Sequence, residues 1–401
     1  MYQSPWPGTI RVMKMKKYYF WVILVLWAYG VTELVSYGGL LFLSKFRHTD
    51  YEPVDVVSAR HQAFIRRLLE QKTDYIAFSP SLGWSVKSNG SSDLYRSNAR
   101  AVRSDREYEM TPPHGVRRVS AFGDSFTHCD EVRNHETWQA IMEGYDTNLE
   151  VLNFGVGAFG LDQSYLRYMK EGRQLHSGIV LIGFMTENIL RHVNTYRPFY
   201  FPKTGLPLTK PRFVVEDGRL ALIPNPMKSL DDYNMLLLQP GETLSRIGAN
   251  DYYYKRRYAS SLFDWSPTVR LVRLLVQRGD EEIPDEEEII IDGHYNEKSE
   301  AFRVTTKIFD RFYSEVAENQ STPVILVFPN QSDLIRARQN KQQMYSTLLS
   351  YFDSVGYRYI DLIEAFDNVE VEDLFSGHYT PLANSLVAEY LFNYINNMSE
   401  E

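Results

Sequence analysis

The apolar positions of residues 117–396 fall into short runs separated by segments of helical spacing. Residues 179–184 (Ile-Val-Leu-Ile-Gly-Phe) and 323–328 (Pro-Val-Ile-Leu-Val-Phe) are near-continuous apolar runs, typical of central strands covered on both faces. Helical spacing follows several such runs, most clearly over residues 297–318. This alternation predicts an α/β fold with a doubly wound parallel sheet of about five strands and right-handed crossovers. The predicted strands are 119–122, 149–154, 179–184, 323–328 and 357–362, and the predicted helices are 128–142, 162–175, 297–318, 332–355 and 381–396.

Residues 196–296 interrupt this alternation and are rich in proline and aromatic residues at their start. An Asp-Gly pair at positions 217 and 218, between two apolar runs, predicts a hairpin of residues 213–215 and 219–223. Residues 265–277 have helical spacing. Insertions at the C-terminal edge of a parallel sheet are well placed to shape a substrate site. We therefore interpret residues 196–296 as a cap or accessory subdomain.

The longest apolar stretch, residues 18–44, follows a basic leader of residues 1–17 and contains Glu33 as its only charged residue. At about 1.5 Å per helical residue it is long enough to span a hydrocarbon core of roughly 30 Å. No small-residue cleavage site follows a short apolar core, which favours an uncleaved signal anchor. A buried helix of a soluble protein is the alternative. Glu33 costs roughly 2–3 kcal/mol at a central position, so it either faces a partner helix or marks a helix that ends near Val31.

The basic leader predicts a single-pass membrane protein with a cytoplasmic N-terminus. The rest of the chain is then extracytoplasmic, in the periplasm or outside the cell. Residues 45–116 are predicted to be a lead-in segment that packs on a main domain of residues 117–396.

Composition excludes some functions. Net charge is −8 and no basic block lies outside the first 17 residues, which argues against nucleic acid as a partner. The single cysteine, Cys129, excludes an internal disulfide and a cysteine zinc cluster. Aromatic residues make up 14% of the chain, with 28 tyrosines, which slightly favours a protein that handles carbohydrate.

Four polar or glycine-rich stretches fall at or after predicted strand ends, on the sheet edge where open α/β proteins bind ligands. The first is the Gly-Asp-Ser turn at Ser125, where a strand-to-helix turn lifts a hydroxyl beside unpaired backbone N–H groups. Without support from the rest of the chain, a Gly-Asp-Ser triplet is equally an ordinary turn with no catalytic role. The second stretch is a glycine-rich loop over residues 153–160, the third ends at Asn188, and the fourth ends at His378.

In this order the four stretches resemble the motifs of the SGNH (GDSL-type) hydrolase superfamily, over about residues 117–396 with the insert between them. The resemblance implies a flavodoxin-like, three-layer α/β fold and no metal or organic cofactor. It implies that Ser125 is the nucleophile and His378 the general base. The backbone N–H of Ser125, a backbone N–H of the second stretch and the side chain of Asn188 would form the oxyanion hole.

The second stretch departs from the family pattern. The family's glycine usually lies five positions after the asparagine of this stretch, which is Ala158 here, with Gly157 just before it. Because the donor is a backbone N–H, alanine also supplies it, and both residues are candidates.

The fourth stretch departs further. The family's catalytic aspartate usually lies two or three residues before the histidine, where this chain has Ser376 and Phe375. Either Asp373 reaches back across the loop, or a backbone carbonyl orients His378 in a Ser–His dyad. Loss of the orienting carboxylate costs up to about 10⁴ in rate in a serine triad, so lost activity is one hypothesis.

Other interpretations of these residues have weaker support. The glycine-rich loop lacks both the Gly-x-Gly-x-x-Gly spacing and a Gly-Lys-Ser/Thr ending, which argues against a nucleotide cradle. His128 and Cys129 suggest a metal or Cys–His site, but no second cysteine exists and adjacent side chains on a helix diverge. Asn188 alone could cap a helix, and His378 alone could be a surface residue at a helix start.

Three functional hypotheses follow. The first is a membrane-anchored serine esterase that acts on acyl esters, with O-acetyl groups of an envelope or secreted glycan, or a small ester, as substrate. The second is an O-acyltransferase that modifies an exopolysaccharide, with a membrane acyltransferase or polysaccharide-assembly protein as partner. The third is a catalytically inactive glycan-binding or assembly protein that retains the fold.

Overall fold

The computed structural model describes residues 8–276, 286–367 and 369–398, which belong to two compact units. The smaller unit is formed by the chain up to residue 56 and by residues from 256 onward in the predicted insert, and the larger unit by the rest. Residues 1–7 of the predicted basic leader and residues 277–285 of the predicted insert, including the last position of the helix predicted at 265–277, lie outside the described residues.

The larger unit is built on a five-stranded sheet in the order β11-β10-β5-β3-β4. Every neighbouring pair is parallel, as predicted, and all five predicted strands are present. If the strands are numbered by their order along the chain, their order across the sheet is 5-4-3-1-2. The direction of winding therefore reverses between strands 1 and 3, and doubly wound sheets bind ligands at such a point. The strands are β3 (Arg117–Gly123), β4 (Leu149–Gly155), β5 (Ile179–Met185), β10 (Thr322–Phe328) and β11 (Tyr359–Asp361).

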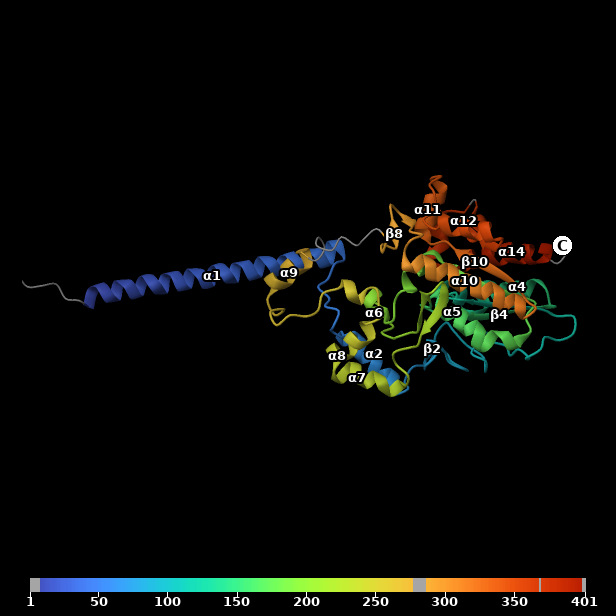
Figure 1. Ribbon diagram of the computed structural model, residues 1–401, viewed down its shortest axis with the longest axis horizontal. Helices are drawn as coiled ribbons and strands as arrows, with labels where there is room; N and C mark the ends of the chain where they lie inside the picture. The colour runs from blue at the N-terminus through green and yellow to red at the C-terminus, as the bar shows by residue number, and fades with distance from the viewer. Residues whose placement is uncertain (1–7, 277–285, 368, 399–401) are drawn as a thin grey trace, which may run out of the picture. The chain divides into compact units, whose positions relative to one another are not determined.

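Helices cover both faces of this sheet and enclose two apolar cores (Figure 1). Successive side chains of a strand point to opposite faces, so Phe122 of β3 belongs to one core and Ala121 to the other. The sheet is therefore the middle of three layers, as the predicted α/β fold requires. The first core is covered by α5 (Leu161–Arg167), α10 (Glu300–Glu318) and α12 (Ser346–Val355), and the second by α4 (Trp138–Tyr145), α11 (Gln331–Arg338) and α14 (Pro381–Met398).

Two predicted helices differ in the structure. The first half of the helix predicted at 128–142 is not α-helical, because the single turn α3 (Ser125–His128) ends at His128, where Cys129 adopts a left-handed conformation at φ 64°. A new helix, α4, starts only after Thr137, whose hydroxyl accepts from the Ala140 N–H at 3.3 Å. The predicted helix 332–355 is divided into α11 and α12 by a turn in which Asn340 has φ 52°. The spacing of apolar residues along a sequence does not reveal where the backbone adopts a left-handed conformation.

Smaller elements surround the sheet. The predicted hairpin is present, with Asp217 and Gly218 both at positive φ between its strands, as a tight two-residue turn requires. The insert otherwise contains short elements. The hairpin strands are β6 (Arg212–Glu216) and β7 (Arg219–Ile223), and the other elements are α2 (Ala59–Leu69), β1 (Ile76–Ser79), β2 (Gly83–Val86), α6 (Arg197–Tyr200), α7 (Tyr233–Leu238), α8 (Pro240–Gly248), β8 (Ile290–Ile291) and β9 (His294–Tyr295).

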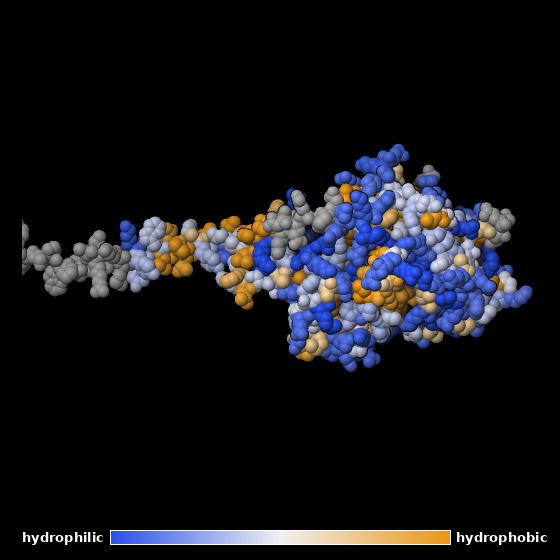
Figure 2. Space-filling view, in the orientation of Figure 1, coloured by the Kyte–Doolittle hydropathy of each residue, from blue (hydrophilic) through white to orange (hydrophobic). Residues whose placement is uncertain are grey.

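The smaller unit contains the helix α1 (Gly8–Arg47) and the helix α9 (Pro267–Val276), which pack against each other. By length and composition, the part Lys17–Arg47 of α1 is long and apolar enough to cross a membrane. Its apolar side chains are exposed along the helix (Figure 2). The helix continues through Glu33 to Arg47, so the alternative of a helix that ends near Val31 is wrong.

Candidate active site

The Gly-Asp-Ser turn lies where β3 ends, and Ser125 is the first residue of the single turn α3. The turn packs closely on the neighbouring strands because two glycines leave space for it. A Cβ atom on Gly123 would lie 2.0 Å from Thr127 Oγ1, and one on Gly155 would lie 2.1 Å from the backbone nitrogen of His128. Ser125 is 5% exposed, and no residue in the described ranges forms a hydrogen bond with its hydroxyl.

Asp124 connects this turn to the segment after β5. The carboxylate is fully buried; Oδ1 accepts from the Phe126 N–H at 2.9 Å and Oδ2 from Asn188 Nδ2 at 2.6 Å. Burial raises the pKa of Asp124, and the nearby Arg191 guanidinium, 3.9 Å away, opposes that shift. An amide nitrogen carries two hydrogens, so Asn188 retains one N–H for a second acceptor. Asp124 therefore holds Asn188 beside the serine turn.

The glycine-rich loop after β4 directs its carbonyl groups toward protein donors. Gly157 O accepts from Trp84 Nε1 at 3.0 Å, Ala158 O from Arg197 Nη1 at 3.2 Å, and Phe159 O from Arg191 Nη1 at 2.8 Å. In the described part of the chain, by contrast, the N–H groups of Gly157 and Ala158 have no acceptor. Ala158 is left-handed, with φ 69°. Two neighbouring backbone donors are thus available to bind an anion, as an oxyanion hole requires.

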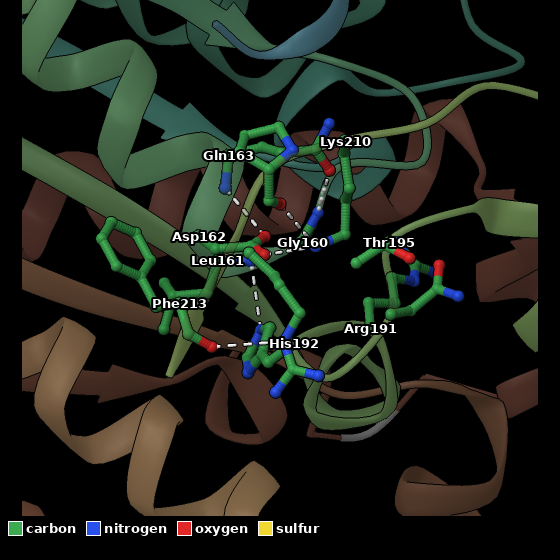
Figure 3. A network of polar contacts seen from close by, with 12 residues as sticks. Gly160, Leu161, Asp162, Gln163, Arg191, His192, Thr195, Lys210 and Phe213 are labelled. Atoms are coloured by element: carbon green, nitrogen blue, oxygen red, sulfur yellow. Dashed lines mark hydrogen bonds and ion pairs between the residues drawn. The ribbon is translucent and has the colours of Figure 1, made fainter. Parts of the chain in front are cut away.

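A buried polar network holds this loop against the segment that follows Asn188 (Figure 3). The N–H of Leu161 donates to His192 Nε2 at 3.2 Å, while His192 Nδ1 lies 2.6 Å from Thr305 Oγ1. Burial lowers the pKa of His192, which keeps the ring neutral and lets Nε2 accept. Figure 3 shows Asp162, at the start of α5, pointing toward Lys210 of the insert, with which it forms a buried ion pair.

His378 lies on β13 (His378–Tyr379), which pairs with β12 (Phe375–Ser376) around Gly377 at φ 81°. Its ring packs 5.3 Å from the ring of Phe126, the residue after Ser125. The structure therefore brings α3 and β13 together, with no hydrogen bond between Ser125 and His378 among the described residues. Catalytic hydrogen bonds are often long in the absence of substrate.

The carboxylate beside His378 belongs to Glu131. Its Oε1 lies 3.5 Å from His378 Nδ1, which forms no hydrogen bond with any described residue, and its Oε2 accepts from the His378 backbone N–H at 3.0 Å. The positive φ of Gly377 favours glycine there, and a Cβ atom at this position would lie 2.7 Å from Oε2. Glu131 itself has φ 73°, and its N–H donates to the Tyr95 hydroxyl at 2.8 Å. The chain is thus folded tightly around this contact.

The structure does not bring Asp373 to His378. Asp373 lies on the short helix α13 (Val371–Leu374), where Val371 and Leu374 are buried and the Asp373 side chain is exposed. Its backbone carbonyl accepts from Thr380 Oγ1 at 2.8 Å, and no described residue pairs with its carboxylate. A one-turn helix that buries the first and fourth residues directs the third outward. Sequence reasoning overlooked Glu131; the only signal for it was a carboxylate six positions after Ser125.

His128 and Cys129 lie in a buried polar cluster. His128 Nδ1 lies 2.5 Å from Asp130 Oδ1 and Nε2 lies 2.8 Å from the Tyr75 hydroxyl. Burial, and then the nearby Arg103 guanidinium, lower the pKa of His128 to about 4, and burial raises the pKa of the Cys129 thiol to about 12. The thiol is therefore protonated and is not a nucleophile near neutral pH. The described residues contain no cluster of three His, Cys, Asp or Glu side chains suited to a metal ion.

Comparison with known proteins gives only structural likenesses. No family model matches the chain, and no curated protein matches it by sequence. Among solved structures, the chain is similar to a lipase/acylhydrolase from Enterococcus faecalis (11% identity, 71% of this chain and 97% of that one, TM-score 0.35). It is also similar to a GDSL-like lipase from Bacteroides thetaiotaomicron (9%, 70% and 89%, 0.32) and a member of the lipolytic protein G-D-S-L family from Veillonella parvula DSM 2008 (13%, 68% and 95%, 0.30).

The strand order, the serine turn after the first strand and the histidine before the last helix are independent observations of this chain. Together they define a three-layer α/β protein that carries a serine turn and a histidine at one edge of its parallel sheet.

Proposed function

We propose that the chain is a membrane-anchored serine esterase that removes acyl groups, with O-acetyl esters of an envelope or secreted glycan as substrate. The observation that carries the proposal is a set of donors on the segments that follow β4 and β5, the two strands that flank the strand before Ser125. The N–H groups of Gly157 and Ala158 lack a described acceptor, and Asn188 retains one side-chain N–H. Such donors hold the negative oxygen that forms when a serine attacks an ester carbonyl.

The proposed reaction has two steps. Ser125 Oγ attacks the carbonyl carbon and His378 takes the hydroxyl proton, so that an acyl-enzyme forms and the alcohol leaves with that proton. Water, deprotonated by His378, then attacks the acyl-enzyme and releases the acid. The N–H groups of Ser125, Gly157 and Ala158 and the side chain of Asn188 bind the oxyanion in both steps.

We assign the orientation of His378 to Glu131 in place of Asp373. A carboxylate beside Nδ1 favours the tautomer that leaves Nε2 free to accept a proton, and it stabilises the imidazolium that forms. Its backbone contact at 3.0 Å also fixes the residue that carries the ring. The absence of an acid at Ser376 and Phe375 was the main support for an inactive protein, and Glu131 supplies the missing carboxylate from another part of the chain.

The substrate class rests on the anchor and the aromatic content. The part Lys17–Arg47 of α1 suits a single span with a cytoplasmic N-terminus and an extracytoplasmic enzyme, where glycans and small esters are accessible. O-Acyl transfer uses the same acyl-enzyme, with a sugar hydroxyl in place of water, and a membrane acyltransferase or polysaccharide-assembly protein is the partner that this alternative requires.

The decisive experiment is labelling of the full chain in detergent with a fluorophosphonate probe. We expect Ser125 to be labelled and S125A to be unlabelled. Folded protein that the probe does not label would contradict both enzyme hypotheses and favour the binding protein. Hydrolysis of p-nitrophenyl acetate, measured with and without a glycan acceptor, then separates the two activities, because a transferase acetylates the glycan and a hydrolase releases acetate.

A further inference from the structure

Glu33 of the apolar helix α1 is hydrogen-bonded to a distant part of the chain. Ser266 Oγ donates to Glu33 Oε1 at 2.6 Å, and the backbone N–H of Thr268 lies 3.2 Å from Oε2. One helical turn further on, Ser36 Oγ lies 3.0 Å from Thr268 Oγ1. These three contacts fix the start of α9 at one level of α1, and Figure 1 shows the two helices side by side.

The contacts have a consequence for a helix that spans a bilayer. Glu33 lies within the apolar stretch 18–44, where no water is available to solvate a carboxylate. Its hydrogen-bond donors must then come from protein, and here they come from Ser266 and Thr268. The segment that carries these donors therefore has to lie at the same depth as Glu33.

The same segment exposes large apolar side chains. Leu262, Phe263 and Trp265, just before Ser266, are 92%, 61% and 68% exposed. On α9, Val272, Leu275 and Val276 are also exposed, although Leu274 is buried. Apolar side chains gathered in this way on one short segment mark a contact with a partner or a lipid surface. On α1, Leu34 and Val35 are exposed as well.

Two of the three charged residues of this segment pair with each other, and Arg270 is the third. Asp264 is paired with Arg273 at 3.0 Å and accepts from the Tyr51 hydroxyl at 2.8 Å. Arg273 also donates to the Ala259 carbonyl at 2.6 Å. Arginine stems lie along apolar surface while their guanidinium groups reach the headgroup layer.

We propose that residues 261–276 form a second membrane-contacting element, docked on α1 through Glu33 and facing the acyl chains with Leu262, Phe263, Trp265 and the outer side of α9. The proposal rests on the proposed membrane anchoring by α1, which it extends from one helix to a helix pair. The ligand is the lipid bilayer itself, and Glu33 is the anchor point for the element rather than a binding site for a second protein.

The first test measures depth with single cysteines in the full chain. The native Cys129 is buried, so added cysteines at L262C, V25C on α1 and V355C on α12 are the reactive ones. The chain is reconstituted in vesicles of phosphatidylethanolamine and phosphatidylglycerol and labelled with bimane. Quenching by nitroxide-labelled lipid is compared with quenching by iodide.

We expect nitroxide lipid to quench L262C and V25C several-fold more than V355C, and iodide to give the opposite order. If V25C is quenched by lipid and L262C behaves like V355C, the second element does not exist although the anchor does. If iodide quenches V25C and nitroxide lipid does not, α1 does not lie in the bilayer. The proposed membrane-contacting element is then contradicted together with the anchor.

The second test measures docking on α1. We expect the pair S36C/T268C to form a disulfide in the same vesicles, because the two hydroxyl oxygens lie 3.0 Å apart. The matched control is V35C/T268C, since Val35 is exposed on α1. Equal cross-linking of the two pairs, or none in either, would contradict the docked arrangement.

Discussion

Glu131 lies 3.5 Å from His378 Nδ1 through one carboxylate oxygen and accepts from the His378 backbone N–H at 3.0 Å through the other. The two residues are separated by most of the domain in sequence. The contact brings the segment after the serine turn to the segment before the last helix. It places a carboxylate beside the proposed general base, where positions 375 and 376 carry none.

We expect Glu131→Gln to lower kcat for p-nitrophenyl acetate by about 10²-fold and to leave KM nearly unchanged. The effect should be smaller than the loss of about 10⁴ for a buried triad carboxylate, because the Glu131 side chain is 50% exposed. Steady-state kinetics of the full chain in detergent measure it. Asp373→Asn is the matched control and should keep full activity. Loss of activity in D373N with an unaffected E131Q would return the role to Asp373.

We expect Asn188→Ala to lower kcat by about 10²–10³-fold, because a donor to the oxyanion is lost. It should also lower the free energy of unfolding by about 1–3 kcal/mol, since the buried Asp124 loses its partner. Kinetics and thermal unfolding together separate the two effects. Asn194→Ala is the control: Asn194 is buried in the same segment and donates to Asp251 at 2.9 Å, so only stability should fall. Equal loss of rate in both variants would argue against a catalytic Asn188.

Stability should fall as the pH is lowered from about 6.5 to about 4. The pKa of buried His128 is about 4 when folded, against about 6.5 when unfolded, so only the unfolded chain binds a proton in this window. The contribution of His128 is about 3 kcal/mol, lost progressively as the pH falls. The Tm measured between pH 7.5 and 4.5 tests this. His128→Gln should flatten the curve in part, because His192 titrates in the same direction. If the dependence of Tm on pH is the same in this variant as in the unchanged protein, His128 is not a cause of the loss of stability at low pH.

Gly155→Ala should destabilise the fold by about 3 kcal/mol or more, because the new methyl group would lie 2.1 Å from the His128 backbone nitrogen. Gly144→Ala is the matched control. Gly144 lies on α4 with no atom within 4 Å of a Cβ, so this change should stabilise the chain by about 0.5–1 kcal/mol. Chemical unfolding of the two variants in parallel measures the difference. A neutral G155A would mean that the serine turn is not packed as tightly as described.

The sequence alone determined the sheet and the order of the motifs. Five apolar runs separated by helical spacing are local patterns, and burial on both faces forces such runs into a parallel sheet, so the predicted strands are all present. The asparagine turn and the serine turn follow directly from the ends of neighbouring strands. The apolar stretch that became α1 is likewise a property of composition and length.

Tertiary structure decided what local patterns do not encode. The chain leaves the helical conformation at the left-handed Cys129, and in the segment that follows, Glu131 lies beside a strand far away in sequence. The spacing of apolar residues does not reveal a single residue with positive φ. No pattern in the sequence links residues 131 and 378 either. The partner of Glu33 lies more than two hundred residues away for the same reason. Contacts between distant segments are set by packing of the whole chain, and they provide the carboxylate for His378 and the donors for Glu33.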